Sequence, residues 1–234
     1  MDGNRRFARE RGLPAMAGHR LGFDKVKEVL DWARQAGIKT VFLYAFSTEN
    51  WQRSKIEVSA LMTLFRKFLK TEVKNLFQRD TRLVCLGELE RFSRGLKKLI
   101  EQATVATKDC RTATLAVALS YGGRAEIVQA AKIFVSKYGR RLAAAGEKEF
   151  NRCLWSAGLP DPDLIIRTGG ERRLSNFLPW QSVYSELYFT KTYWPALTRQ
   201  EFETIIAGYR ERERRFGRTS DQLAGEPLER KADA

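Results

Sequence analysis

Hydrophobic and polar residues along the chain form two kinds of pattern, one with helical spacing and one of short continuous apolar runs. Apolar residues recur at helical spacing over 23–33, and Gly37 follows at the place of a helix C-terminal cap. Similar helical patterns occupy 56–77, 92–107, 126–138 and 200–215, with a less regular one over 148–156. The apolar runs predict strands at 38–46, 82–86, 114–119, 164–166 and 187–189.

This alternation of strands and helices predicts an α/β fold, a single domain with a mostly parallel central sheet flanked by helices. The domain is expected to occupy 1–217, and 218–234 reads as a polar tail. In such sheets, ligands bind beyond the carboxyl ends of the strands. The loops that begin at Ser47, Ser120 and Arg167 are therefore the places to look for a site.

The loop 167–176, RTGGERRLSN, follows a short apolar strand directly. It combines two glycines, whose backbone can approach a ligand closely, with three arginines and the Ser175 hydroxyl. The planar fork of arginine matches phosphate oxygens in a bidentate manner, so the segment is a candidate diphosphate cradle. A solvated charged loop is the alternative, and the position after an apolar strand favours the cradle.

The segment 1–8, MDGNRRFA, places the Asp2 carboxylate beside a glycine, an amide and two arginines. One carboxylate together with substrate phosphate oxygens is the usual way in which a protein holds Mg²⁺, although a solvated Asp2 fits the sequence as well. His19 is the only histidine and precedes a predicted helix, where backbone N–H groups favour anions. Spacing alone leaves a capping or core role and a ligand role open for His19.

The predicted helix over 56–77 carries more apolar surface than one helix face needs. A helix buried on two sides explains this pattern, and so does a helix that forms one wall of a channel for a hydrocarbon chain. The sequence leaves both interpretations open.

The formal net charge of +14 attracts polyanions in general, among them nucleic acid, anionic lipid and phosphorylated small molecules. The arginines singled out here follow buried strands together with glycines and are not interleaved with exposed aromatic residues. Nucleic acid is therefore not expected as a partner. Three widely spaced cysteines form neither a disulfide framework nor a metal pattern, which indicates a reducing cytoplasm.

Seven segments together resemble the cis-prenyltransferase (Z-isoprenyl diphosphate synthase) family, to which undecaprenyl diphosphate synthase belongs. They follow the family's order across nearly the whole chain and are MDGNRRFA at 1–8, GHRLG at 18–22, YAFSTENWQR at 44–53, EVSALM at 57–62, SYGGRAEI at 120–127, RTGGERRLSNFLPWQSVYSELYFT at 167–190 and ERRFG at 213–217. The aspartate-rich signature of trans-prenyltransferases is absent from the sequence.

The resemblance implies a homodimer with a Mg²⁺-dependent active site at the end of a hydrophobic tunnel. It implies catalytic roles for Asp2 and Asn50 and metal ligation by Asp2 and Glu186. The residues implied to bind substrate are Gly3, Asn4, Arg6 and His19 around the allylic diphosphate, Ser47, Glu49, Trp51 and Arg53 in a mobile loop with Asn50, and Arg167, Arg173 and Ser175 at the isopentenyl diphosphate site. The segment 215–217 is implied to reach a partner subunit's site.

The implied activity is the condensation of isopentenyl diphosphate with an allylic prenyl diphosphate, farnesyl diphosphate, to a long-chain Z-polyprenyl diphosphate. Because this product is a lipid, peripheral contact with a membrane is expected. A catalytically silent partner subunit is the alternative function. Retention of Asp2, Asn50 and Arg167 favours the enzyme.

The sequence departs from the family's pattern in three places. The family has an apolar strand leading into the MDGN motif, so a first strand upstream of residue 1 is expected, and its lack favours the silent subunit. No arginine occurs over 13–17, where the family often has one for the allylic diphosphate. Arg5 and Phe7 replace the Gly and Trp that are common in bacterial members.

Overall fold

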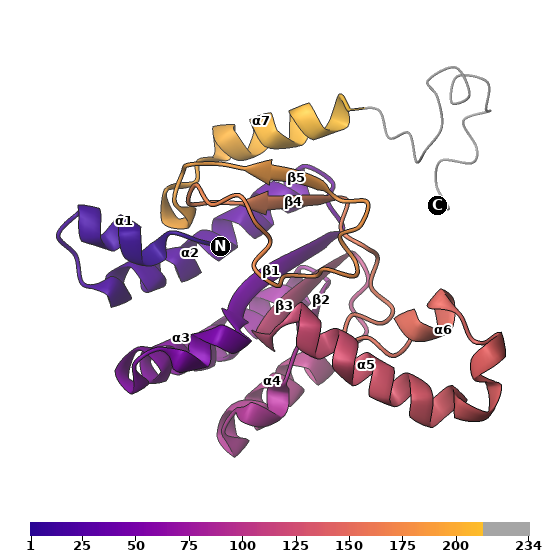
Figure 1. Cartoon of the computed structure of the whole chain (residues 1–234). Coiled ribbons are helices and arrows are strands. Elements are labelled where there is room, and N and C mark those ends of the chain that lie inside the picture. Colours follow the sequence, from indigo (N-terminus) through magenta and orange to yellow (C-terminus); the bar gives the residue numbers. More distant parts are fainter. Residues whose placement is uncertain (213–234) are drawn as a thin grey trace.

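The computed structural model describes residues 1–212 and has an α/β fold (Figure 1). One parallel sheet contains β1 (Thr40–Ser47), β2 (Thr81–Leu86) and β3 (Ala113–Tyr121), with β3 in the centre. A second parallel pair contains β4 (Leu164–Arg167) and β5 (Glu186–Phe189). The predicted fold class and the mostly parallel pairing are confirmed.

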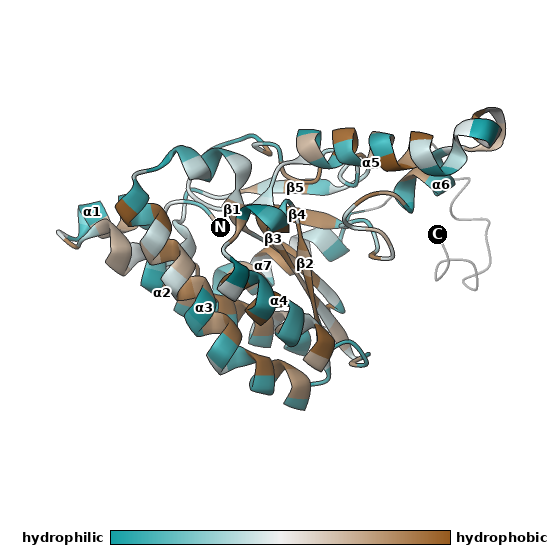
Figure 2. Ribbon diagram, turned by 90° about the horizontal axis from the view of Figure 1, so that it is seen from below, coloured by the Kyte–Doolittle hydropathy of each residue, from teal (hydrophilic) through white to brown (hydrophobic). Residues whose placement is uncertain are grey.

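Helices cover both faces of the three-stranded sheet. The helices α3 (Lys55–Gln78) and α4 (Arg94–Ala106) lie on one side, and α5 (Gly123–Tyr138) lies on the other (Figures 1 and 2). The short α1 (Asn4–Glu10) packs on α2 (Ala15–Gln35), α6 (Glu147–Asn151) packs on α5, and α7 (Arg199–Arg210) contacts α2. No helix within residues 1–212 is long and apolar enough to cross a bilayer.

The central strand β3 supplies two cores because its side chains alternate between the two faces of the sheet. Leu115, Val117 and Leu119 belong to the main core with α2, α3 and α4, whereas Ala116 and Ala118 belong to a second cluster on the other face. Burial on both faces explains why β3 reads as a continuous apolar run.

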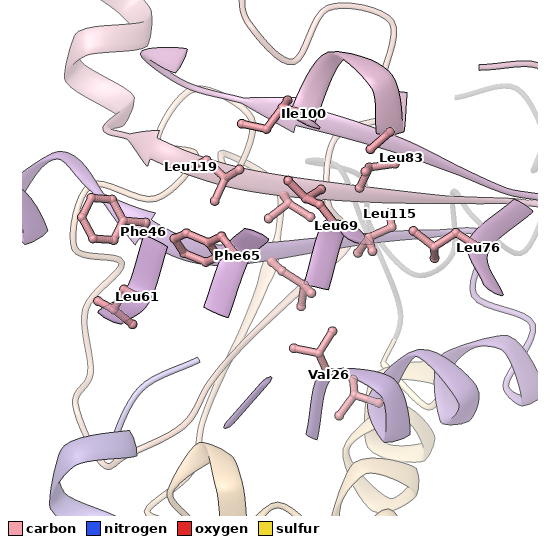
Figure 3. Packing of buried hydrophobic residues seen from close by; sticks show 14 of the residues in the cluster. Val26, Phe46, Leu61, Phe65, Leu69, Leu76, Leu83, Ile100, Leu115 and Leu119 are labelled. Carbon is pink, nitrogen blue, oxygen red and sulfur yellow. The ribbon is translucent and has the colours of Figure 1, made fainter. Parts of the chain in front are cut away.

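The inner face of α3 packs on this main core. Phe65 and Leu69 point toward Leu115 and Leu119 of the sheet (Figure 3), and Phe65 also contacts the Phe46 ring at 6.1 Å between centroids. The other apolar residues of α3 are not all buried, since the Phe77 side chain is 61% exposed. The excess apolar surface of this helix is therefore shared between core and surface.

The predicted strand bounds agree with the structure to within two residues at each end. The helix predictions were less accurate. α1 was not predicted, and α2 begins at Ala15, eight residues before the apolar pattern begins. The predicted helices 148–156 and 200–215 end early, at Asn151 and Arg210. Residues 213–215 of the predicted helix 200–215, the segment 215–217 and the tail 218–234 lie outside the described residues, and the upstream strand stays a prediction.

The missed part of α2 contains Gly18 and Gly22, which disfavour a helix by intrinsic propensity. Here they are required by close packing of α1. A Cβ atom on Gly18 would lie 2.0 Å from the Asn4 carbonyl oxygen, and one on Gly22 would lie 2.3 Å from Asn4 Oδ1. The contact between the two helices thus overrides the local propensity.

Candidate active site

The loops after β1, β3 and β4 converge at one edge of the fold. Ser47 at the end of β1 pairs with Tyr121 at the end of β3. The Tyr44 hydroxyl lies 3.2 Å from the Tyr121 carbonyl oxygen and 3.4 Å from that of Ser175, in the loop after β4. This edge is the carboxyl end of the strands, where the sequence placed the site.

Asp2 is held against the residue that follows β4. Its amide donates to Thr168 Oγ1 at 3.0 Å, and its carbonyl accepts from the same hydroxyl at 3.0 Å. The Asp2 carboxylate accepts from Arg167 Nη2 at 3.0 Å and from the Gly3 amide at 2.6 Å. Two segments 165 residues apart in sequence therefore form one polar cluster.

Burial alone would raise the pKa of Asp2. The hydrogen bonds from Arg167 and the Gly3 amide and the charges of Arg167 and Arg6 outweigh burial and hold the pKa below its usual value. Asp2 is therefore a carboxylate at neutral pH, which is the state that can bind a cation.

Arg167 is the centre of the second half of this cluster. Its Nη1 atom donates to Ser175 Oγ at 2.8 Å and to the Arg173 carbonyl oxygen. Ser175 has a φ of 49°, a left-handed conformation that few non-glycine residues adopt. The loop thus curls back over the end of β4 and brings the Arg173 carbonyl and the Ser175 hydroxyl to one guanidinium group. The Arg173 side chain pairs with Glu171 at 2.6 Å.

Gly169 allows the two segments to approach closely. Its φ of +89° strains any other residue, and a Cβ atom there would lie 3.2 Å from the Asp2 carbonyl carbon and 2.9 Å from Arg6 Nη2. Arg6 lies 3.5 Å from Asp2 Oδ1 and 3.7 Å from Glu171 Oε1. The close approach of Asp2 and Arg6 therefore explains why a glycine occupies position 169.

The loop after β1 contains a short 3-10 helix, η1 (Thr48–Gln52), whose start is capped by hydrogen bonds between Ser47 and Asn50. Asn50 Oδ1 accepts from the Ser47 amide at 3.1 Å, and Glu49 Oε1 accepts from Asn176 Nδ2 at 3.2 Å. Asn176 also accepts from the Arg124 amide through its Oδ1 atom at 2.8 Å. Asn176 therefore links the loops after β1, β3 and β4.

His19 lies inside α2 with 7% of its surface exposed, so it does not cap the helix. Its Nε2 atom lies 3.3 Å from Glu57 Oε1, and Arg53 Nη1 donates to the same oxygen at 3.0 Å. Burial lowers the pKa of His19, Glu57 acts to raise it, and the charges of Arg53 and Arg5 lower it further. The net result is a lowered pKa, which favours a neutral imidazole at pH 7.

A cavity of about 850 Å³ opens beside these groups. Its polar lining includes ten of the predicted site residues, Asp2, Asn4, His19, Ser47, Glu49, Asn50, Arg53, Arg167, Arg173 and Ser175. Its apolar lining comes from α2, α3 and the sheet and includes Phe23, Val26, Leu61, Phe65, Leu69 and Leu119. One hollow thus joins a charged region to an apolar one.

A second cavity of about 680 Å³ adjoins the first and shares Asp2, Asn4, His19 and Arg53 with it. Its lining adds Gly3, Arg6, Arg5 and Arg9 from the start of the chain and α1. Asn4 Oδ1 is buried and has no hydrogen-bond partner within the described part of the chain. This second cavity is strongly basic.

Two predicted site residues line neither cavity. Trp51 Nε1 donates to Ser120 Oγ at 2.9 Å, and its ring packs on Phe46 at 5.0 Å between centroids, so it anchors the loop in the core. Glu186 begins β5 and pairs with Leu164 of β4, which lies three residues before Arg167. The Glu186 carboxylate pairs with Arg212 at 2.5 Å. Three strand positions span roughly 10 Å, so the chain does not bring Glu186 to Asp2.

Protein side chains alone do not form a metal centre within residues 1–212, where no group of three His, Cys, Asp or Glu residues gathers. Asp2 fits Mg²⁺ in another way. Its carboxylate is 39% exposed and lines both cavities, so substrate phosphate oxygens could complete the coordination.

Four residues of the site were not singled out from the sequence: Glu57, Thr168, Glu171 and Asn176. Thr168 and Asn176 lie within the arginine-containing loop, so their position beside Arg167 and Ser175 was a usable signal. Glu57 lies four residues after Arg53, and Glu171 lies two residues before Arg173 in the same loop, so these two pairs were also usable signals. The pairs of Glu57 with Arg5 and of Glu171 with Arg6 join distant segments, and no sequence spacing reports them.

Comparison with known proteins identifies relatives across nearly the whole chain. Residues 1–217 match the family described as "Putative undecaprenyl diphosphate synthase". An isoprenyl transferase of Aquifex aeolicus is 43% identical over 222 residues, covering 95% of both chains. A Pseudomonas aeruginosa protein named ditrans,polycis-undecaprenyl-diphosphate synthase ((2E,6E)-farnesyl-diphosphate specific) is 43% identical over 97% of this chain and 91% of its own.

A solved structure shares the fold closely. The crystal structure of lavandulyl diphosphate synthase from Lavandula x intermedia, in complex with dimethylallyl diphosphate, has a TM-score of 0.89 and 35% sequence identity. It covers 93% of this chain and 95% of its own. With its basic loop after β4, its buried strands and this range of relatives, the chain belongs to the undecaprenyl diphosphate synthase family of prenyltransferases.

Proposed function

We propose that this protein condenses isopentenyl diphosphate with an allylic prenyl diphosphate to give a long-chain Z-polyprenyl diphosphate. The observation that carries the proposal is the cavity of about 850 Å³, in which the cluster of Asp2 and Arg167 meets an apolar lining. A substrate with an anionic head and a hydrocarbon tail matches that division. The Pseudomonas aeruginosa relative named for farnesyl diphosphate supports farnesyl diphosphate as the starter.

The diphosphate of isopentenyl diphosphate is assigned to the loop after β4. Arg167 and Arg173 supply guanidinium groups and Ser175 supplies a hydroxyl, all within the first cavity. The allylic diphosphate is assigned to the second cavity, where Gly3, Asn4 and Arg6 stand near His19. The two diphosphates then meet on either side of Asp2, which lines both cavities.

In the reaction, the bond between the allylic carbon and its diphosphate breaks and the diphosphate leaves with the electron pair. The alkene of isopentenyl diphosphate forms the new carbon–carbon bond, and a proton is then lost from the isopentenyl unit. Cationic groups that face the leaving diphosphate stabilise its developing charge. Ser47, Glu49, Asn50 and Arg53 of the loop after β1 line the cavity, and this loop would exclude water from the carbocation. Asn50 is the residue of this loop that we propose to be catalytic.

Mg²⁺ is proposed as the cofactor, held by Asp2 together with phosphate oxygens of the substrate. When bound it would supply positive charge to the leaving diphosphate. Glu186 stays a predicted ligand, and its ion pair with Arg212 has to open before it can bind a cation.

The apolar part of the first cavity is proposed as the tunnel for the growing chain, with α3 as one wall. A homodimer is proposed as well, supported by exposed apolar side chains on α5 and β5, namely Val128, Val135 and Leu187. Contact with the membrane is proposed to be peripheral and the location cytoplasmic.

The test is incubation of the purified protein with farnesyl diphosphate, radiolabelled isopentenyl diphosphate and Mg²⁺, followed by chain-length analysis of the products. We expect long Z-prenyl products, and we expect Asp2→Ala to lower the rate by about a thousandfold because it removes the carboxylate that would hold Mg²⁺ at the leaving diphosphate. Addition of EDTA should abolish turnover. A folded protein that makes no product, alone or with Mg²⁺, would contradict the proposal and favour a silent subunit.

A further inference from the structure

Glu57 lies in the first turn of α3 and gathers basic side chains from three different parts of the chain. Its carboxylate oxygens lie 3.0 Å from Arg53 Nη1, 3.3 Å from His19 Nε2 and 3.7 Å from Arg5 Nη1. Arg53 precedes α3, His19 lies in α2 and Arg5 lies in α1. The Glu57 side chain is 13% exposed, and those of His19 and Arg53 are 8% and 29% exposed, so these two contacts are largely shielded from water, whereas the Arg5 side chain is 60% exposed.

The local sequence alone explains Glu57 differently. Ser54 is the N-cap of α3 and accepts from the Glu57 amide at 3.3 Å, which is half of a capping box. In a complete capping box, a glutamate at this position returns its side chain to the N-cap amide. Here the Glu57 carboxylate instead turns to Arg53, His19 and Arg5, so its side chain serves tertiary contacts and not the helix start.

The three basic residues line the second cavity, and Glu57 lines neither cavity. Glu57 thus lies behind the groups that face the ligand. Without its carboxylate, the guanidinium groups of Arg53 and Arg5 would have no anion between them, and like charges repel, while His19 would lose its hydrogen-bond partner. One carboxylate therefore sets the direction in which Arg53 and His19 point.

We propose that Glu57 is a positioning residue for the allylic diphosphate: it holds Arg53, His19 and Arg5 in place at the second cavity before the substrate enters. This inference rests on the proposed function, since it names the residue that organises one of the two diphosphate sites. Glu57 acts through Arg53 and His19 and does not touch the reacting atoms.

The position of Glu57 also links the loop after β1 to the helices. Ser47 begins this loop through its contact with Asn50, and Arg53 ends it through its contact with Glu57. Loss of the Glu57 charge should therefore release the Arg53 end of the loop while the Ser47 end stays capped. The same loss of charge should weaken binding of the allylic diphosphate and leave binding of isopentenyl diphosphate at Arg167 unchanged.

The test compares Glu57→Gln with Glu72→Gln. Glu72 lies on the same helix, is 8% exposed and pairs with Lys27 at 2.6 Å, but it lines neither cavity. For Glu57→Gln we expect the KM for farnesyl diphosphate to rise about tenfold, because misplaced binding groups cost this much or more, and the KM for isopentenyl diphosphate to change less than twofold. Glu72→Gln should change neither KM.

A second readout does not depend on turnover. His19 is the only histidine of the chain, so its ring protons titrate as a single set in an NMR spectrum. Because Glu57 acts to raise the pKa of His19 against burial, Glu57→Gln should lower that pKa further and Glu72→Gln should leave it unchanged. A purely structural role for Glu57 would lower the melting temperature of Glu57→Gln and weaken the binding of both substrates alike.

Direct binding of farnesyl diphosphate, measured by calorimetry, separates failure of this inference from failure of the proposed function. If the unaltered protein forms no product, the proposed function fails, and weaker binding by Glu57→Gln still supports the positioning role. Unchanged binding by a folded Glu57→Gln, or an equal loss for both substrates, overturns it. If Glu57→Gln does not fold, Glu57→Asp keeps the charge with a shorter reach and must show the same preference for the allylic substrate.

Discussion

Arg167 after β4 and Arg53 before α3 both line the larger cavity, but the protein holds them differently. The Arg167 side chain is 14% exposed, and its two terminal nitrogens contact Asp2, Ser175 and the Arg173 carbonyl. The Arg53 side chain is 29% exposed, and its guanidinium contacts Glu57. Several contacts therefore hold Arg167, whereas a single carboxylate holds Arg53, and that carboxylate also contacts His19 and Arg5.

The difference follows from how each region is built. The loop after β4 is one continuous segment whose backbone is tied down, since the Gly169 and Gly170 amides donate to the Thr192 and Thr190 carbonyls. The Arg53 region is assembled from α1, α2 and the start of α3, so its geometry depends on how three helices pack. The loop after β4, the strand side of the site, can present a preformed binding site. The region around Arg53, the helix side, can change when a ligand competes with Glu57 for Arg53.

Within this comparison, the largest expected difference comes from replacing the two arginines by lysine in turn, which keeps the charge and loses the planar fork. Arg167→Lys removes three contacts at once and should lower kcat/KM about a hundredfold, mainly through the KM for isopentenyl diphosphate. Arg53→Lys should cost less than about tenfold, because an ammonium group still pairs with Glu57. Steady-state kinetics with each substrate varied in turn will measure both, and equal losses would refute the contrast between the two sides.

A smaller effect is expected from Gly169→Ala, which tests the rigidity of the strand side. Both Gly169 and Gly158 have positive φ, of +89° and +80°, but only the Cβ atom at Gly169 would contact Asp2 and Arg6. We expect Gly169→Ala to lower the free energy of unfolding by about 1–3 kcal/mol and Gly158→Ala to lower it less. Urea denaturation of both variants is the measurement, and equal losses would mean that backbone strain alone, without the close approach, explains the glycine.

The smallest effect concerns the pH dependence of the helix side. The pKa of His19 is lowered in the folded protein, first by burial and then by Arg53 and Arg5 against Glu57. The unfolded chain, with an ordinary histidine pKa of about 6.5, then binds more protons, so the free energy of unfolding falls as pH drops below about 6.5. Above that pH the contribution of His19 is fully present.

His19→Gln should remove this part of the pH dependence. We therefore expect the stability of the unaltered protein to fall relative to that of His19→Gln between about pH 7 and pH 5.5, in urea denaturation at a series of pH values. A constant difference between the two proteins over this range would show that His19 binds protons equally well in the folded and unfolded states.

Much of the fold was predictable because buried parallel strands and amphipathic helices leave strong local patterns. The run 114–119 and the spacing over 56–77 identified β3 and α3 almost to their ends. The Arg167 side of the site was predictable for a similar reason, since arginines, glycines and Ser175 occur in one short segment after a strand. Because ligands bind beyond the carboxyl ends of parallel strands, this segment was predicted to lie at the ligand-binding edge of the sheet.

Other features depended on contacts that no local pattern reports. Gly18 and Gly22 lower helix propensity, yet they lie inside α2 because α1 packs on them. Trp51 reads as part of a substrate loop, but its indole N–H donates to Ser120 in the core. Glu186 was predicted to bind the metal with Asp2, and the strand register places it away from Asp2, beside Arg212.

The order of the strands, the parallel α/β class and the loop that carries Arg167 could be predicted from the sequence, because each of these depends on residues close together in the chain. Which charges meet depends on the tertiary structure. Glu57 joins Arg5, His19 and Arg53 across as many as 52 positions, and Asp2 joins Arg167 across 165. Electrostatic pairs form between groups that packing brings within a few ångströms, and packing is a property of the whole fold.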